Sequence, residues 1–510
     1  MKKRYVLVAN LLLFVFIYIY FTQISPLFPF DGDDWRYIGG IRLPFPMWGV
    51  WNPTRVLPET LMGIGGYIAA FLVYPISHNY VNSLMYVEAF IFSGFIIGFF
   101  ISYYGLLTKR FKVSKKIAIA SEFLFFISFF LLFKHLNQPS YNGFWTVDLA
   151  CEFFYLIPGM LNATVVMYME QSSNFFNHFI RLSNFKKGLF ILALYFALFS
   201  NTQLTIIIAA YSSFKIIQTL INKKWEINTQ YFKTISIYLA ILIIWLGTIL
   251  FDLNGQRAKD VQEMHGSSFG VNFIATVEQF KSFLLLQNVK IIYLFIAVII
   301  FAFVYWLYTN DKNIKQEGNT FIWTISNSIF CLVCSMVYLI IAYSKAGSQY
   351  AIRPDAMWAI IFFFLFTVNV SFIYLVNNIG IVKPILPLLI VILSLISFNF
   401  NYHQVPATNA PYAAITARNV DNYIISQVKR ADENGKAKVI VRVPLDSKDA
   451  NPKVSTSNWP HSYDMATWLQ NTLYSHGIIR SRIRIVFKPE KAVNSRFYEN
   501  KNQQPFVPFE

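Results

Sequence analysis

Long apolar stretches separated by short polar segments run along the chain as far as about residue 400. A helix needs about 20 mostly apolar residues to cross the hydrocarbon core of a bilayer. The stretches are continuous rather than alternating, which argues against a membrane β-barrel. The pattern therefore predicts about eleven transmembrane helices, at 5–24, 85–107, 117–133, 148–169, 187–200, 204–220, 234–253, 291–308, 321–343, 356–377 and 383–399.

The positions of Lys and Arg predict the orientation of these helices. Cytoplasmic loops carry an excess of both residues, and such clusters recur at 109–116, 181–187, 223–233 and 312–315. We expect a cytoplasmic N-terminus, with the run after Lys2-Lys3-Arg4 retained as a first helix because no small-residue cleavage site follows. The apolar stretch 61–76 would place the cluster at 109–116 outside if it crossed the membrane. It is therefore predicted to be an interfacial or re-entrant helix on the outer side.

Composition agrees with a membrane protein and excludes two other classes. The chain has 510 residues, of which 55% are hydrophobic and only 14% charged, whereas soluble domains average about a quarter charged. The aromatic content of 18% excludes a disordered chain. The net charge of +17 is explained by topology, so no nucleic-acid partner is expected. Cys331 and Cys334 have the spacing of a redox or metal pair, but they lie in a membrane-like segment and are interpreted as inert thiols.

The segment 401–510 is polar and predicts a small extracytoplasmic α/β domain after the transmembrane domain 1–400. Helical periodicity covers 413–433, with Gly435 placed to end the helix, and a second helix is expected at 461–475. β-branched alternation predicts strands at 438–445 and 482–487. Arg482 and Arg484 fall on one strand face, which is interpreted as solvated rather than substrate-facing.

The first outer loop, at 26–84, gathers charged and aromatic residues just beyond the first predicted helix. Neighbouring carboxylates raise one another's pKa and bind cations, arginines bind phosphate, and aromatic rings suit both the membrane interface and sugar stacking. Either these groups pair with one another, or one carboxylate is a general base or metal ligand and an arginine binds a lipid phosphate. The residues concerned are Asp31, Asp33, Asp34, Trp35, Arg36, Tyr37, Arg42, Trp48, Trp51, Arg55 and Glu59.

Acidic residues in predicted helices are a second source of candidate sites, because such residues are costly in a membrane. Asp148 and Glu152 are four residues apart and share a helix face. They either complete a cation site with the acids of the first loop or pair with Lys134. Glu88 and Glu122 lie deeper and are expected to pair with polar groups of neighbouring helices.

Three further polar segments lie on the predicted outer side. In the short loop 344–355, Arg353 is a candidate phosphate ligand beside Tyr350, although it could instead cap the next helix or pair with Asp355. The hairpin apex 200–203 contacts a sugar or simply forms a turn. His265, in the loop 254–290, is interpreted as structural.

Two short motifs and the overall layout resemble a known family. Asp33-Asp34-Trp35 follows the first predicted helix, and Asn52-Pro53-Thr54-Arg55 opens an apolar helix about 20 residues later. This arrangement resembles the multi-spanning GT-C glycosyltransferases, particularly bacterial members that decorate cell-surface polymers. The number of helices, the large first outer loop and the tail stretch ATWLQNTLYSHGI are also similar. Bacterial relatives often have Gly-Arg where this chain has Thr54-Arg55.

The resemblance implies an inverting glycosyltransferase of the bacterial cytoplasmic membrane. The donor would be a sugar on polyprenyl phosphate, and the acceptor a cell-envelope polysaccharide, teichoic acid or other glycan on the outer face, with membrane lipids as further partners. Asp34, or alternatively Asp33, would activate the acceptor hydroxyl or hold a divalent metal ion, the one cofactor considered. Substrate-binding residues would be Trp35, Arg36, Arg55, Glu59, Tyr350 and Arg353, and metal ligands Asp33, Asp34, Asp148 and Glu152.

Two other functions are compatible with the sequence. A polymerase that joins lipid-linked repeat units would share the arginines and the large outer surface. A flippase or transporter would place charges near the membrane midplane and often contain inverted repeats. The chain shows no internal repeat, and its polar residues gather toward the outer face.

Overall fold

The computed structural model describes residues 3–29, 31–135, 141–146, 148–222, 225–226, 228–264, 269–309, 312–380, 382–397, 414–444 and 465–497. Within these ranges, eight helices are long and apolar enough to cross a membrane. They are Arg4–Ile24 (α1, Lys3–Ile19, with η1, Tyr20–Ile24), Val56–Ser77 (α3, Val56–Ile68; η2, Ala69–Val73; α4, Tyr74–Ser77), Tyr80–Lys109 (α5), Leu149–Glu170 (α7, Leu149–Cys151; η3, Glu152–Leu156; α8, Ile157–Glu170), Thr229–Leu253 (α12), Val289–Tyr308 (α15), Gly318–Ala346 (within α16, Lys312–Ala346) and Trp358–Asn378 (α17). The chain is thus a helical membrane protein, as its apolar pattern predicts.

The number of such helices differs from the predicted eleven. Seven of the eight overlap predicted helices, and the eighth, Val56–Ser77, contains the stretch 61–76 that was expected to be interfacial. Its 22 residues are long enough for a crossing. However, Tyr74 near its end accepts a hydrogen bond from Lys429, and Trp35 before its start accepts one from Thr472, so both flanks of the helix meet the same C-terminal segments. This arrangement is compatible with the interfacial interpretation. The remaining predicted crossings form shorter helices within the described ranges: α6 (Lys115–Leu131), α10 (Asn184–Leu198), α11 (Ile206–Asn222) and α18 (Val382–Ser397).

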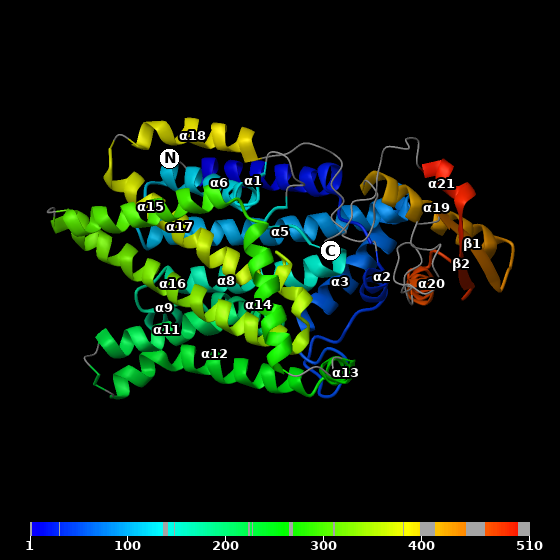
Figure 1. The fold of residues 1–510 in the computed structure, drawn as a ribbon, viewed down its shortest axis with the longest axis horizontal. Helices are drawn as coiled ribbons and strands as arrows, with labels where there is room; N and C mark the ends of the chain where they lie inside the picture. Colours follow the sequence, from blue (N-terminus) through cyan, green and yellow to red (C-terminus); the bar gives the residue numbers. More distant parts are fainter. Residues whose placement is uncertain are drawn as a thin grey trace.

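The long helices lie side by side along the long axis of the molecule (Figure 1). Helix α17 is buried along most of its length, whereas α15 exposes most of its apolar side chains and so lies at the bundle surface. Aromatic rings fill the centre: Phe99 of α5 contacts Phe125 and Phe129 of α6 and Trp358 and Phe362 of α17 at centroid separations of 5.4–6.1 Å. Such offset and edge-on contacts add to the stabilisation from burial.

The two ends of the bundle differ in what they carry (Figure 1). One end holds α2 (Gly32–Ile38), α13 (Gln256–Met264) and the C-terminal segments, and is called the α2 end. The other holds α9 (Phe175–Ile180) and the last turn of α5, and is called the opposite end. Helix α14 (Phe269–Leu285) and the 3-10 helix η4 (Ser348–Ile352) pack together beside α16.

The C-terminal segments form a small α/β unit, called the tail. It comprises α19 (Ala414–Glu433), β1 (Lys438–Pro444), α20 (Met465–Ser475), β2 (Arg484–Glu490) and α21 (Lys491–Phe497). The two strands pair in parallel, with Lys438 opposite Arg484, so a crossover is required and α20 lies within it. The predicted helix at 413–433 and both predicted strands are confirmed. Gly435 has a φ of +65° where α19 ends, and Arg482 and Arg484 are exposed while Ile483 is buried between them.

The tail is fixed to α2 and to the start of α5. The Thr472 hydroxyl donates to the carbonyl of Trp35, and the Ser475 hydroxyl donates to the carbonyl of Gly39 over 2.9 Å. A Cβ at Gly39 would overlap the Thr472 side chain, so glycine is required for this close approach. His476 hydrogen-bonds the Tyr80 hydroxyl, and burial lowers the pKa of His476 to about 4, which leaves its ring neutral near pH 7.

Candidate functional site

The N-terminus of α2 is held by a reciprocal capping box. Asp31 is the N-cap residue and its carboxylate accepts from the amide of Gly32, while Asp34 accepts from the amide of Asp31 over 3.0 Å. The second oxygen of Asp34 accepts from the amide of Ala150 over 2.6 Å. Because Ala150 lies in the first turn of α7, the carboxylate of Asp34 joins two helix N-termini, where negative charge is favoured.

Asp33 and Asp34 are adjacent in sequence but lie in opposite environments. The Asp34 side chain is fully buried and both of its oxygens accept from backbone amides. A general base must reach the proton that it removes. Because both oxygens of Asp34 accept from backbone amides here, the structure gives no support to the catalytic role expected for Asp34, which stays a prediction. The side chain of Asp33 is exposed. Asp33 is therefore the carboxylate available for chemistry at this position.

Three arginines face Asp33. Partial loss of hydration raises the pKa of Asp33, and the negative charge of Asp31 raises it further. The positive charges of Arg257, Arg36 and Arg55 act in the opposite direction. The net result is an Asp33 pKa above its usual value, in a field that remains positive.

Arg55 and Arg36 lie against aromatic rings instead of acids. The Arg55 guanidinium is buried and stacks on the ring of Phe154 at 4.9 Å. Arg36 lies over the rings of Trp51 at 5.6 Å and Trp468 at 5.0 Å. Neither arginine has an ion-pair partner among the residues that the structure describes. Arg55 is buried and Arg36 half-buried, and neither has a carboxylate in ion-pair contact within the described ranges, so both guanidinium groups can bind an anionic ligand.

Arg257 enters the site from the first turn of α13. Its side chain donates to the Tyr350 hydroxyl over 3.0 Å, and its backbone amide donates to the carbonyl of Trp51 over 3.4 Å. Like Arg36 and Arg55, it forms no ion pair within the described ranges. Sequence reasoning placed Arg257 in an outer loop but assigned it no role, because no local pattern links it to residues about 200 positions earlier.

The other two arginines near α2 have acidic partners. Arg42 pairs with Glu59 at 2.8 Å, and the amide of Asn52 donates to the other Glu59 oxygen over 2.7 Å. Glu59 therefore pairs with Arg42 and not with Arg55, which lies only four residues before it in the sequence. The loop between α2 and α3 turns back on itself, which brings Arg42 to Glu59 and leaves Arg55, the residue before α3, facing Phe154.

Arg353 is likewise neutralised, although it borders the site. It donates to both oxygens of the buried Asp355, over 3.2 and 2.5 Å, which supports the pairing alternative over phosphate binding. Its guanidinium also lies over the rings of Tyr155 at 5.2 Å and Tyr350 at 5.4 Å. Tyr350 thus joins Arg353 to Arg257, and its substrate-binding role stays a prediction.

Asp148 and Glu152 serve the start of the helix Leu149–Glu170. Asp148 caps it by accepting from the amide of Cys151 over 2.7 Å, and Glu152 accepts from the hydroxyl of Thr146 over 3.1 Å. Loss of hydration raises the pKa of Asp148 to about 6, against the effect of nearby Arg353. Neither acid pairs with Lys134 in the structure.

The four predicted metal ligands do not converge. Within the described ranges, no three His, Cys, Asp or Glu side chains are grouped so as to hold a metal ion. Asp34, Asp148 and Glu152 instead accept hydrogen bonds from backbone amides or a hydroxyl. The donor set therefore does not fit a divalent cation, and the chemistry of the site is considered without one.

The remaining predicted candidates have structural surroundings. At the apex 200–203, Asn201 donates to the carbonyl of Phe154 over 2.6 Å, and Thr202 donates to Asp252 over 2.7 Å, which supports the turn interpretation. Glu88 was expected to pair with a polar group of another helix, but both of its oxygens are buried without a hydrogen-bond partner in the described part of the chain. His265 lies outside the described residues.

The arrangement around Asp33 combines two chemical capacities. Arg257, Arg36 and Arg55 act on Asp33 by charge, as does the carboxylate of Asp31, and the guanidinium groups are suited to binding phosphate oxygens. The carboxylate of Asp33 can accept a proton, and the rings of Trp51 and Trp468 offer flat apolar surfaces. The tail contributes Trp468, a residue that the sequence did not single out. Comparison with protein-family models, curated proteins and solved structures found no match to the chain.

Proposed function

We propose that this protein is an inverting glycosyltransferase of the GT-C type in the bacterial cytoplasmic membrane. It moves a sugar from a polyprenyl-phosphate donor to a cell-envelope polysaccharide, teichoic acid or other glycan. The α2 end and the tail face the outside, and the N-terminus faces the cytoplasm. The observation that carries the proposal is the exposed carboxylate of Asp33 facing three arginines that have no acidic partner in the described chain.

The proposed reaction needs one proton acceptor and one anion-binding group. The acceptor hydroxyl gives its proton to Asp33 while its oxygen attacks C1 of the donor sugar. The bond between C1 and the phosphate oxygen breaks, and its electron pair stays on the phosphate, so the configuration at C1 inverts. A carboxylate with a raised pKa is a stronger base, which supports Asp33 in this role.

The arginines act on the leaving group. As the C1–O bond breaks, negative charge grows on the phosphate, and fixed cations at that position stabilise the transition state. Arg55 and Arg257 are suited to this because each is held by neighbouring groups, Arg55 on the Phe154 ring and Arg257 by the Tyr350 hydroxyl. Neither must first release an acidic partner among the described residues. Arg36 contacts the rings of Trp51 and Trp468, which would form a sugar-binding surface beside Arg55 and Arg257.

The test compares envelope glycans from four strains: a deletion strain, and the same strain expressing the wild-type chain, Asp33→Asn or Glu433→Gln. Glu433→Gln is the matched control because it removes one exposed carboxylate at the end of α19, away from the site. Sugar composition and chain length are measured, together with the amount of protein in the membrane. We expect one sugar substituent to be missing in the deletion and Asp33→Asn strains only, at equal protein levels.

Other outcomes decide against the proposal or change it. Shortened chains with unchanged composition would identify a polymerase of lipid-linked repeat units instead. Full sugar content with Asp33→Asn would remove Asp33 as the base. If the deletion changed neither composition nor length, the glycosyltransferase proposal would fail altogether and a flippase or transporter would become the better hypothesis.

A further inference from the structure

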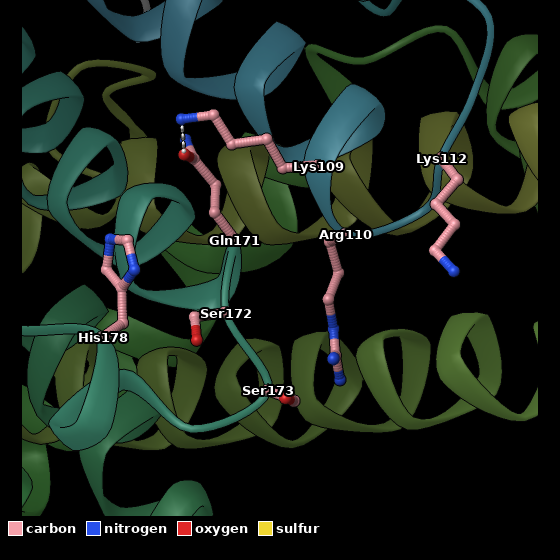
Figure 2. A pocket seen from close by; sticks show the side chains of 7 residues that line it. All are labelled: Lys109, Arg110, Lys112, Gln171, Ser172, Ser173 and His178. Carbon is pink, nitrogen blue, oxygen red and sulfur yellow. Dashed lines mark hydrogen bonds between the residues drawn. The ribbon is translucent and has the colours of Figure 1, made fainter. Parts of the chain in front are cut away.

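A second polar site lies at the opposite end of the bundle. A pocket of about 400 Å³ is lined by the last residue of α5, by residues that follow α5 and α8 in the chain, and by one residue of α9. Figure 2 shows Arg110 and His178 on either side, with Ser172 and Ser173 between them. Helix α5 has 30 residues, which at 1.5 Å per residue places the pocket roughly 45 Å from the start of that helix. The pocket is therefore separate from the site around Asp33.

The cations that line this pocket have no acidic partners. Lys109 donates to the side-chain oxygen of Gln171 over 2.9 Å, the dashed contact in Figure 2. The Nε atom of Arg110 is buried and has no hydrogen-bond partner in the described part of the chain. Neither these two residues nor Lys112 forms an ion pair within the described ranges, and no Asp or Glu lines the pocket.

The neutral lining groups can donate hydrogen bonds to an anion. Gln171 is fixed by a bond from its amide to the carbonyl of Ser102 over 3.2 Å. The Ser172 hydroxyl donates to the carbonyl of Asn174 over 3.0 Å, so the Ser173 hydroxyl is the serine donor that the described contacts leave to the pocket. Partial burial lowers the pKa of His178, and the charge of nearby Lys109 lowers it further. The imidazole is therefore neutral near pH 7 and contributes a hydrogen bond instead of a charge.

Membrane topology alone does not explain this arrangement. Lys and Arg at one end of a bundle orient a protein in the membrane wherever they point. Here they line a hollow that also has hydroxyl and amide groups. The chain turns at Lys112 with a φ of +54°, a conformation that favours glycine. The buried rings of Phe111 and Phe321, stacked at 4.1 Å, hold this turn in place.

We propose that this pocket binds a phosphate group, carried by an anionic lipid headgroup or by a soluble phosphate ester. Several cations without counter-charges, with neutral donors beside them, match the charge and the several acceptor oxygens of a phosphate. The volume of the pocket falls in the range of about 300–1,000 Å³ that is usual for ligand pockets, so it has room for a phosphate group together with part of the molecule that carries it. Occupancy of this pocket does not depend on the reaction proposed for the α2 end.

The experiment uses the purified full-length protein in neutral detergent. Native mass spectrometry measures retention of phosphatidylglycerol against phosphatidylcholine, and calorimetry measures binding of inorganic phosphate against chloride at equal ionic strength. The test variant is the double substitution Arg110→Gln with Lys112→Gln. Its matched control is Lys115→Gln with Lys116→Gln, which makes the same change in charge in exposed residues that do not line the pocket.

We expect the wild-type protein to prefer phosphatidylglycerol or to bind phosphate, with affinity about tenfold weaker in the test variant and changed less than twofold in the control. Retention of the lipid without binding of inorganic phosphate would identify a lipid headgroup as the source, and the reverse would identify a soluble ester. Equal losses in the two variants would overturn the proposal, because surface charge would then explain the binding. So would a wild-type protein that shows neither preference, a result that does not depend on any variant folding.

Discussion

Both ends of the bundle carry clusters of cationic side chains, but the groups beside these cations differ. At the α2 end, Arg36 and Arg55 stack on aromatic rings and face the carboxylate of Asp33. At the opposite end, Arg110 and Lys112 line a pocket with hydroxyl and amide groups and no carboxylate. Binding an anion needs only the cations, whereas transferring a group also needs a proton acceptor within reach. This difference is why we propose chemistry for the first end and binding alone for the second.

Two other arginines at the α2 end differ from Arg36 and Arg55 because they are paired with carboxylates. Arg42 and Arg353 each bond a carboxylate, Glu59 and Asp355 respectively, so their charges are already neutralised. They hold loops together. Only an arginine without such a partner keeps its charge for a ligand, and this distinction depends on the fold and not on residue type.

The largest predicted effect is the loss of transfer in Arg55→Gln. Removing one group that stabilises developing charge costs about 10²–10³ in rate. The initial rate of incorporation of the sugar that the deletion strain lacks, measured in membranes, should fall by about that factor. Arg484→Gln, on the exposed face of β2, is the matched control and should retain the wild-type rate. A fall of less than threefold in Arg55→Gln would mean that this arginine does not act on the leaving group.

The next effect concerns stability. Asp34→Ala leaves the buried amides of Asp31 and Ala150 without the Asp34 carboxylate as their acceptor. Hydrogen bonds to charged groups contribute about 1.5–3 kcal/mol each, so the free energy of unfolding should fall by about 3 kcal/mol. Asp33→Ala, whose side chain is exposed, should change it by less than about 0.5 kcal/mol. Unfolding in mixed micelles measures both, and equal losses would show that the two acids do not differ in this way.

A smaller effect is expected where the tail meets α2. Gly39→Ala places a methyl group against Thr472 and pushes α20 away, and with it Trp468. Because misplacement by about 1 Å can cost as much as 10²-fold, we expect about a tenfold lower transfer rate with normal membrane insertion. Adding Thr472→Ala removes the nearest clashing atom and should restore part of the rate. A double variant no faster than Gly39→Ala would contradict this explanation.

The smallest effect is a shift in pH dependence. The base form of Asp33 exists above its raised pKa, so transfer should decline as pH falls through that pKa. Asp31→Asn removes a charge that raises the pKa of Asp33, and should move this acidic limb to lower pH. Arg36→Gln removes a charge that lowers it, and should move the limb to higher pH. Rate profiles of the three proteins test the signs, and a limb that stays in place would exclude Asp33 as its origin.

Much of the fold could be predicted because the relevant signals are local. Hydropathy located seven of the eight long apolar helices, and alternation placed both strands of the tail. The helix Val56–Ser77 is long and apolar enough to cross a membrane, yet its end at Tyr74 and the preceding α2 both contact the tail. The interfacial position that the orientation rule indicates for 61–76 therefore stays a prediction compatible with the structure. Hydropathy does not show where a helix begins; caps and loop contacts decide that.

The site was predictable only in part, because pairing depends on distant contacts. The first outer loop was correctly singled out as a gathering of acids and arginines. The sequence could not tell Asp33 from Asp34, since the difference arises from the amide of Ala150, 116 positions away. It could not bring Arg257 or Trp468 to the same place, nor separate Arg55 from Arg42, because each depends on how the chain folds back.

The contact between Thr472 and Trp35 also sets an order of events during synthesis. The two residues are 437 positions apart, and ribosomes add about 5–20 residues each second. Helix α2 therefore waits roughly 20 to 90 seconds after emerging before its tail partner has been made. During that interval Arg36 lacks the Trp468 ring that covers it in the finished protein. A chain whose synthesis stops before Trp468 lacks this contact with Arg36, so under the proposed function we expect such a chain to be inactive in transfer.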